Sequence, residues 1–220
     1  MGEARDGVRT ARRDVTRERV LDAAREVFAE RGVFGGSVED ICERAGFTRG
    51  AFYSNFTDKA DLLEALIARE HARLLAQLDA SAALAGERSA AAVGGPAPDL
   101  AAVLAGIVER ILVAVPGDRQ LSMVQTELEI HAIRQPASSA SFREADTRFR
   151  ARIAEFIERG MALQGRELTV PSPFVADAAV AMVARSVRRA LLAGDDADPD
   201  AMARAVLPGF LLGVSRPLAD

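Results

Sequence analysis

The spacing of apolar residues predicts a series of helices that begins near the N-terminus. Between residues 16 and 31 the apolar positions recur at i, i+4, i+7 and i+8, which places them on one face of a helix: Val20, Ala24, Val27 and Phe28. Thr16 is suited to cap the start of this helix, and Gly32 is suited to end it. Shorter helices are expected at about 37–45, 49–55 and 59–80, each preceded or opened by a Ser, Thr or Asp.

The rest of the chain continues the helical pattern. Apolar periodicity returns in five segments separated by Gly and Pro, at about 100–115, 118–134, 138–164, 173–193 and 199–214. Residues 81–98, rich in Ala, Gly, Ser and Pro, are interpreted as a loop or a frayed helix end. Because no segment alternates convincingly like a strand, we expect an all-α fold of about nine helices, the last kinked at Pro208.

Composition agrees with helices and argues against several classes of protein. Ala is abundant, Trp is absent and there is one Tyr, which favours helices over sheets. The single Cys42 allows neither an internal disulfide nor a Cys-rich zinc site, and two His argue against a His-rich metal cluster. No strand–turn–helix places a nucleophilic Ser, and no paired carboxylates stand at useful spacing. We therefore expect no enzyme, no metal and no cofactor.

The sequence lacks the usual signals for membrane insertion or export. Its longest uncharged run, 205–215, has eleven residues, whereas a membrane helix needs about 20 apolar residues. The N-terminal residues are charged and contain no apolar signal core. A soluble, cytoplasmic protein without a membrane partner is expected.

The net charge of −4 does not by itself indicate a nucleic-acid partner. Residues 1–60 carry 11 basic and 11 acidic groups, so a DNA-binding surface there must be a local arrangement. Residues 1–15 contain four arginines and little that could pack, and they are interpreted as a flexible arm. Insertion of this arm into a minor groove is an alternative to simple solvation.

Residues 37–59 have the dimensions of a helix-turn-helix unit, because two short helices meet across the turn Ala45-Gly46-Phe47. Such a unit needs a small apolar core to hold its second helix outward, and suitable residues are present: Phe28, Val38, Ile41, Ala45, Phe47, Phe52 and Phe56. The other side of the second helix then presents Thr48, Arg49, Gly50, Tyr53 and Asn55. A helical bundle with a coincidental Gly turn is the competing interpretation.

The exposed residues of this unit suit a DNA duplex. Arg49 can donate two hydrogen bonds to guanine O6 and N7, or else contact a phosphate, and Gly50 lets the backbone approach the bases. Phosphate oxygens, which set register rather than sequence, can be bound by polar side chains and at helix starts. The candidates for these contacts are Ser37, Thr48, Tyr53, Asn55 and Lys59.

One combination of residues within about 16–66 is characteristic of a family. It comprises Arg19-Val-Leu-Asp-Ala-Ala-Arg-Glu-Val-Phe28, Gly32, Ser37-Val-Glu-Asp-Ile41, Ala45-Gly-Phe-Thr-Arg-Gly-Ala-Phe-Tyr53, Phe56 and Lys59. By these residues the chain resembles the DNA-binding domain of TetR-family transcriptional regulators. The resemblance implies an all-α fold, with three N-terminal helices for DNA and about six more for ligand binding and dimerisation. It also implies phosphate contacts at Thr48, Tyr53 and Lys59 and base-facing positions at Arg49 and Gly50. Asn55 stands where the family usually has His.

The segments 173–193 and 199–214 are apolar on nearly every side, and such helices must be covered on both sides. One side can meet the monomer core. We expect the other side to meet a second copy in a homodimer, as the resemblance also implies. A two-fold dimer could place its recognition helices in successive major grooves, about 34–36 Å apart or a multiple of that, on a near-palindromic double-stranded operator.

A pocket for an unknown small-molecule effector is expected within residues 61–220. Its candidate lining combines apolar residues with polar ones at the edge of a helix face: Val124, Gln125, Leu128, His131, Phe149, Ile153, Phe156 and Met182. An apolar cavity with a few polar groups is typical of such sites. An ordinary filled core is the alternative, because Phe142, Phe149 and Phe156 repeat every seven residues on one helix.

These patterns predict three parts: a flexible Arg-containing arm at 1–15, a helix-turn-helix domain at 16–60, and a ligand-binding and dimerisation domain at 61–220. The expected function is that of a DNA-binding transcriptional regulator, a repressor that a ligand releases from its operator. The alternative is a constitutive helical DNA-binding or interaction protein that has no small-molecule effector.

Overall fold

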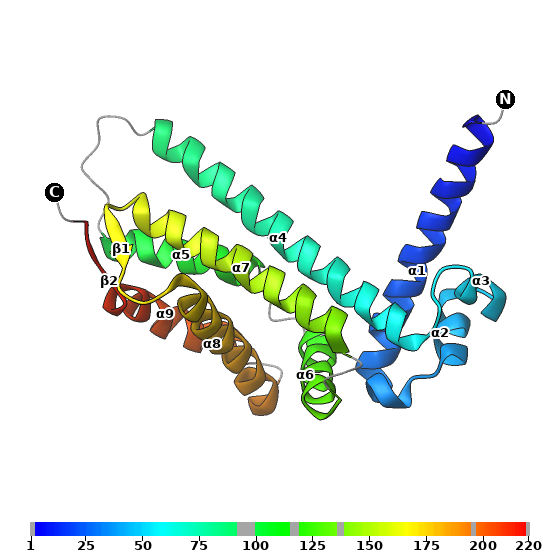
Figure 1. Ribbon diagram of the computed structural model, residues 1–220. Coiled ribbons are helices and arrows are strands. Elements are labelled where there is room, and N and C mark those ends of the chain that lie inside the picture. The colour runs from blue at the N-terminus through cyan, green and yellow to red at the C-terminus, as the bar shows by residue number, and fades with distance from the viewer. Residues whose placement is uncertain (1–2, 92–99, 115–118, 136–138, 195–196, 219–220) are drawn as a thin grey trace. The chain divides into compact units, whose positions relative to one another are not determined.

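The structure, a computed structural model, describes residues 3–91, 100–114, 119–135, 139–194 and 197–218 (Figure 1). The chain forms two compact units, one of residues 1–70 with 119–143 and the other of residues 71–118 with 144–220. Apart from two three-residue strands, the regular secondary structure of the described residues is helical, which confirms the expected all-α class. No described helix is both long enough and apolar enough to cross a membrane.

The first unit is built on α1 (Glu3–Gly35), whose backbone is broken at Gly32. Gly32 has φ 77° and ψ 160°, a conformation that glycine adopts easily and residues with a Cβ rarely adopt. Gly32, where the helix was predicted to end, therefore interrupts α1. A further turn follows it, closed by the Gly36 N–H, which donates to the Gly32 carbonyl at 3.0 Å. Four further helices contribute to this unit: α2 (Val38–Ala45), α3 (Arg49–Tyr53), the beginning of α4 (Lys59–Ala91) and α6 (Arg119–Arg134).

The core of the first unit joins all of these helices. Phe28 of α1, Ile41 and Ala45 of α2, Phe52 of α3 and Phe56 are buried together, and Val38 and Phe47 pack against them as the sequence predicted. The beginning of α4 and the middle of α6 close the cluster, through Leu62, Leu63, Leu66, Ile67, Val124 and Leu128. Burying a large apolar side chain stabilises a fold by about 1.5–3 kcal/mol, so this cluster holds α3 in place.

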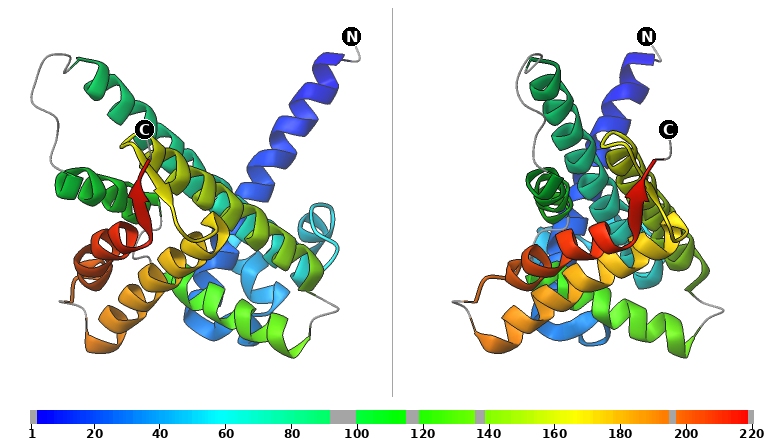
Figure 2. Two further views of the ribbon diagram at one scale, coloured as in Figure 1. Left: turned by 60° about the vertical axis from the view of Figure 1, so that its left-hand side comes forward. Right: turned by 90° about the vertical axis from the view of Figure 1, so that its left-hand side faces the viewer.

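The second unit contains the rest of α4 with α5 (Leu100–Ala114), α7 (Ala140–Ala162), α8 (Ser172–Ala193) and α9 (Ala201–Gly213). Helix α9 packs against α5 and α8, and Figure 2 shows α8 and α9 in orange and red. Leu207 and Leu211 of α9 and Val183 of α8 are buried, and the Ser186 hydroxyl accepts a hydrogen bond from Ala203 N–H. Pro208 lies inside α9, and its kink stays a prediction.

The structure differs from the sequence-based expectations in three places. Residues 3–15, interpreted as a flexible arm, form the first turns of α1, since Ala and Arg propagate a helix readily once it has begun. Residues 81–91, interpreted as a loop or a frayed helix end, are a continuation of α4, whereas residues 92–98 lie outside the described part. Two strands that sequence analysis missed, β1 (Arg166–Leu168) and β2 (Ser215–Pro217), pair antiparallel with Glu167 opposite Arg216. Three residues are too few to show alternation.

Candidate nucleic-acid interface

Helix α2 begins with a reciprocal cap between Ser37 and Asp40. The Ser37 hydroxyl accepts from Asp40 N–H at 3.1 Å, and an Asp40 carboxylate oxygen accepts from Ser37 N–H at 2.9 Å. These hydrogen bonds stabilise the charged form of Asp40, and together with Arg31 they lower its pKa from 3.8 to about 2. Ser37, a candidate phosphate contact, thus fixes where α2 starts.

The turn between α2 and α3 is set by two residues. Gly46 adopts the left-handed conformation, φ 71° and ψ 32°, and its N–H donates back to the end of α2. Thr48 has an extended backbone, and its hydroxyl accepts from Ala51 N–H at 3.3 Å, which caps α3. Glycine and an N-cap threonine therefore give a three-residue turn, which runs from Gly46 to Thr48 and so begins one residue later than predicted, because Ala45 is the last residue of α2.

Helix α3 presents one side to the core and the other to solvent. Phe52 is fully buried, and its ring centroid lies 5.7 Å from that of Phe56. The candidates Thr48, Arg49, Gly50 and Tyr53 are exposed, Tyr53 to 50%. A Cβ added at Gly50 would meet only the Thr48 hydroxyl, at 3.8 Å. The backbone of α3 at Gly50 is therefore accessible to another molecule.

Arg49 is exposed but held by two neighbours. Its Nη1 lies 2.7 Å from Oε1 of Glu39 on α2, and its guanidinium carbon lies 5.9 Å from the centre of the Tyr53 ring. A hydrogen bond with Tyr53 and the charge of Glu39 raise the pKa of Arg49. Because an arginine has five N–H donors, one ion pair leaves enough of them for a bidentate contact.

Asn55 and Lys59 are more engaged with the protein than the other candidates. Both contacts that the structure gives the Asn55 amide nitrogen are internal, to the Ala51 carbonyl at 2.8 Å and the Ser54 hydroxyl at 3.2 Å. The Lys59 ammonium donates to the carbonyls of Val33 at 3.0 Å and Gly36 at 3.1 Å. Lys59 therefore joins the start of α4 to the end of α1, with one of its three N–H groups left for another acceptor.

Sequence analysis did not predict that three arginines of α1 contact the helix-turn-helix. Arg13 donates to the Ser54 carbonyl at 3.0 Å, and Arg17 donates to the Asn55 carbonyl at 3.2 Å. Arg19 donates to the Ala45 carbonyl at 3.3 Å. The carbonyls at helix ends lack partners within their own helices, so these arginines satisfy them. The four-residue spacing of Arg13 and Arg17, which puts them on one helix face, was the available signal.

The candidate effector residues are divided between the two units. On α6, in the first unit, Val124 and Leu128 are buried in the hydrophobic cluster, and the His131 ring lies 5.4 Å from that of Phe34. Gln125 is half-buried on the same helix. The other four candidates lie in the second unit, with Phe149, Ile153 and Phe156 buried on α7 and Met182 half-buried on α8.

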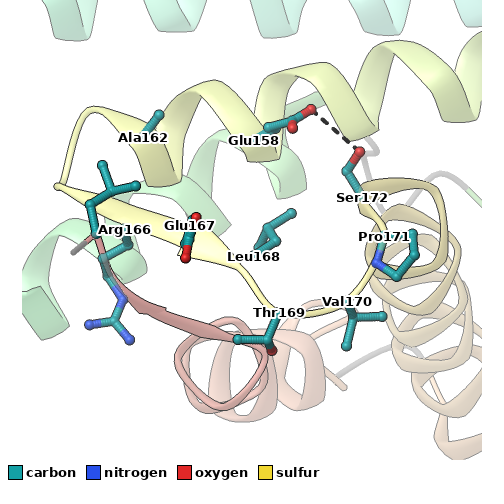
Figure 3. Close-up of a pocket in the computed structure, with 10 residues that line it drawn as sticks. Glu158, Ala162, Arg166, Glu167, Leu168, Thr169, Val170, Pro171 and Ser172 are labelled. Carbon is teal, nitrogen blue, oxygen red and sulfur yellow. Dashed lines mark hydrogen bonds between the residues drawn. The ribbon is translucent and has the colours of Figure 1, made fainter.

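The structure contains a surface pocket in the second unit that sequence analysis did not predict (Figure 3). It has a volume of about 400 Å³ and is lined by the end of α7, β1, the connection to α8 and the last described residue. Leu168 lies in its middle, and the Ser172 hydroxyl contacts the Glu158 carboxylate at 3.4 Å. None of the eight candidate effector residues lines this pocket.

Known sequences match the N-terminal part of this chain. Residues 20–66 match the family of bacterial regulatory proteins called the tetR family. A stretch of 62 residues is 44% identical to the HTH-type transcriptional regulator SrpR of Pseudomonas putida and covers 28% of this chain and 29% of that protein. A stretch of 54 residues is 48% identical to the HTH-type transcriptional repressor BepR of Brucella suis, covering 24% of this chain and 26% of the repressor. This chain thus spans under a third of the length of each relative.

Solved structures extend the likeness to nearly the whole chain. A TetR transcription regulator from Haloarcula marismortui aligns with a TM-score of 0.67 at 19% identity, over 92% of this chain and 100% of that one. FadR from Bacillus subtilis, solved in complex with stearoyl-CoA, aligns with a TM-score of 0.64 at 19% identity, over 88% of this chain and 96% of that one. At these identities the likeness establishes the fold. Residues 20–66 thus match the helix-turn-helix domain of the tetR family of bacterial regulatory proteins, and the chain shares the fold of solved TetR-family structures.

Proposed function

We propose that this protein is a dimeric transcriptional repressor that binds a near-palindromic DNA operator through α3 and is released from it by a small-molecule ligand. The observation that carries the proposal is the division of α3 into two sides. Phe52 anchors it in the core, while Thr48, Arg49 and Tyr53 are exposed beside one another. A short helix held in this way can enter a major groove.

Within this proposal the exposed residues have different roles. Arg49 donates to guanine O6 and N7 and so reads sequence, and Gly50 admits the backbone close to the bases. The phosphates are bound by side chains around α3 and at the starts of α2 and α4, which orient the protein on the duplex: Ser37, Thr48, Tyr53, Asn55 and Lys59. The internal hydrogen bonds of Asn55 make its contribution the smallest of these.

Dimerisation through α8 and α9 is supported by exposed apolar side chains on both helices. Leu192 of α8 is 83% exposed, and Val206 and Leu212 of α9 are 47% and 44% exposed. The intervening residues Ala205 and Gly209 are small and exposed, which would let a second helix approach closely. A second copy of the chain would remove this apolar surface from water, with each copy covering the other.

Release by a ligand requires two shapes of the dimer, of which the ligand binds one more tightly. We propose that an effector binds in the helical region from residue 61 onward and that the helix beginning at Lys59 transmits the change. FadR of Bacillus subtilis, whose fold is similar, was solved with stearoyl-CoA, and the relative BepR is named a repressor. The burial of Phe149, Ile153 and Phe156 favours the competing function, a constitutive DNA-binding protein without an effector.

Selection of bound sequences from random duplex DNA tests the proposal. The wild-type chain should enrich a near-palindrome with guanine at a fixed position in each half, and Arg49→Ala should lose that guanine. Arg148→Ala serves as the control, because Arg148 is an exposed arginine on α7 with one ion pair, to Glu144. No enrichment by the wild-type chain would overturn the proposed DNA binding. Anisotropy on the selected operator with candidate effectors then separates a ligand-released repressor from a constitutive binder.

A further inference from the structure

An acidic side chain stands directly beside the proposed base-reading arginine. Glu39 is the second residue of α2, its side chain is 56% exposed, and its Oε1 lies 2.7 Å from Nη1 of Arg49. A carboxylate on a DNA-facing surface repels phosphates and lowers affinity for every duplex. On a surface that served only to bind phosphate, an acid at this place would be a disadvantage.

The carboxylate also restricts the arginine. Glu39 holds Nη1 from α2, and Tyr53 contacts the same guanidinium from the next turn of α3. An exposed arginine otherwise samples many rotamers, and an ordered one loses less entropy when it binds a base. Held in this way, Arg49 can present its remaining N–H groups in a fixed direction.

We propose that Glu39 is a specificity-determining residue, which orients Arg49 toward guanine and uses its carboxylate to accept a hydrogen bond from N4 of a neighbouring cytosine. This inference rests on the proposed DNA-binding function. Carboxylates accept from cytosine N4, whereas the O6 and O4 acceptors of guanine and thymine repel them. Nη1 of Arg49 and Oε1 of Glu39 lie 2.7 Å apart, so the two side chains stand side by side, as two groups that contact adjacent base pairs must.

The competing interpretation is a surface ion pair without a role, because exposed pairs contribute little to stability. The two interpretations predict different effects on discrimination. If Glu39 selects bases, its loss strengthens binding to random DNA and weakens the preference for the operator. If it is a surface charge, its loss raises the affinity for all duplexes by one common factor.

The matched variants are Glu39→Gln and Glu43→Gln, because Glu43 is another exposed acid on α2 and each change removes one negative charge. Anisotropy at fixed salt gives the Kd of each variant for the selected operator and for a scrambled duplex of equal length. The Kd for the scrambled duplex divided by the Kd for the operator should fall about tenfold for Glu39→Gln, within the range for one base contact. It should stay at the wild-type value for Glu43→Gln. Equal ratios in the two variants would overturn the role of Glu39.

A double mutant separates an action through Arg49 from a direct contact. In an Arg49→Ala background, in which the guanine preference is already lost, Glu39→Gln should still remove the preference for cytosine in a selection from random DNA. If the cytosine preference is absent from the wild-type selection, the proposed cytosine contact is wrong. Failure of the wild-type chain to bind any selected duplex would instead overturn the proposed function, so the two failures are distinguishable.

Discussion

The carboxylate of Glu127 on α6 accepts a hydrogen bond from the backbone N–H of Val33, the residue that follows the break in α1. The break at Gly32 interrupts the helix, so this N–H needs an acceptor from elsewhere. The Val33 carbonyl in turn accepts from Lys59. One peptide segment is therefore held at its N–H by α6 and at its carbonyl by α4, directly before the helix-turn-helix.

Glu127→Ala should destabilise the first unit, since it leaves the half-buried Val33 N–H without its acceptor. The expected loss is about 1–3 kcal/mol in the free energy of unfolding. Urea denaturation followed by circular dichroism measures it, with Glu129→Ala, an exposed acid on the same helix, as the control. Equal stability of the two variants would mean that the Glu127 contact does not hold this segment.

Gly36, just before α2, and Gly50, in α3, should respond in opposite ways to substitution by alanine. A Cβ at Gly36 would lie 2.8 Å from Cγ1 of Val27, so Gly36→Ala should destabilise the fold by about 1–3 kcal/mol. A Cβ at Gly50 has room inside the protein, so Gly50→Ala should keep or raise the thermal midpoint. The same Cβ would stand between the backbone and the bases, so Gly50→Ala should weaken operator binding. A stable Gly36→Ala protein would contradict the packing argument.

The cap at the start of α2 predicts how stability depends on pH. The pKa of Asp40 is lowered to about 2, so the stability it contributes is fully present above about pH 4 and is lost as the pH falls through about 2. Asp40→Asn should reduce the change of the thermal midpoint between pH 5 and pH 2. Glu43→Gln, a substitution of an acid outside the cap, should leave that change nearly at the wild-type value. An unaltered pH dependence in Asp40→Asn would show that the cap is not formed in solution.

Much of the candidate site could be predicted from sequence because its signals are local. Gly46, Thr48 and Phe52 specify a turn, a cap and a buried face within seven residues, and each has the predicted role. The partners that position this unit could not be predicted in the same way. Glu127 is 94 positions from Val33, and the strands β1 and β2 pair Glu167 with Arg216, 49 positions away. Such contacts depend on the packing of whole helices, which no short spacing encodes.

Arg49→Ala and Lys59→Ala should weaken DNA binding in different ways. Arg49→Ala should reduce the preference for the selected operator over scrambled DNA by about tenfold. Lys59→Ala should weaken both duplexes equally and reduce the slope of log K against log salt by about one. Because Lys59 also donates to two backbone carbonyls, its variant should unfold at lower urea than Arg49→Ala does. Equal effects of both variants on every duplex would contradict the division of roles.

The last prediction concerns the exposed apolar surface of α9. Leu212→Glu should convert a dimer into a monomer, because a two-fold interface through α9 would bring the new carboxylate and its copy into an apolar contact, where burying charge is costly. Leu163→Glu is the control, since Leu163 is 82% exposed and lies outside α8 and α9, so the variant should remain dimeric. Sedimentation velocity reports the mass, and anisotropy should show weaker binding to the full palindrome for Leu212→Glu than for Leu163→Glu. A monomeric wild-type chain, or a dimer that only Leu163→Glu disrupts, would place the interface elsewhere.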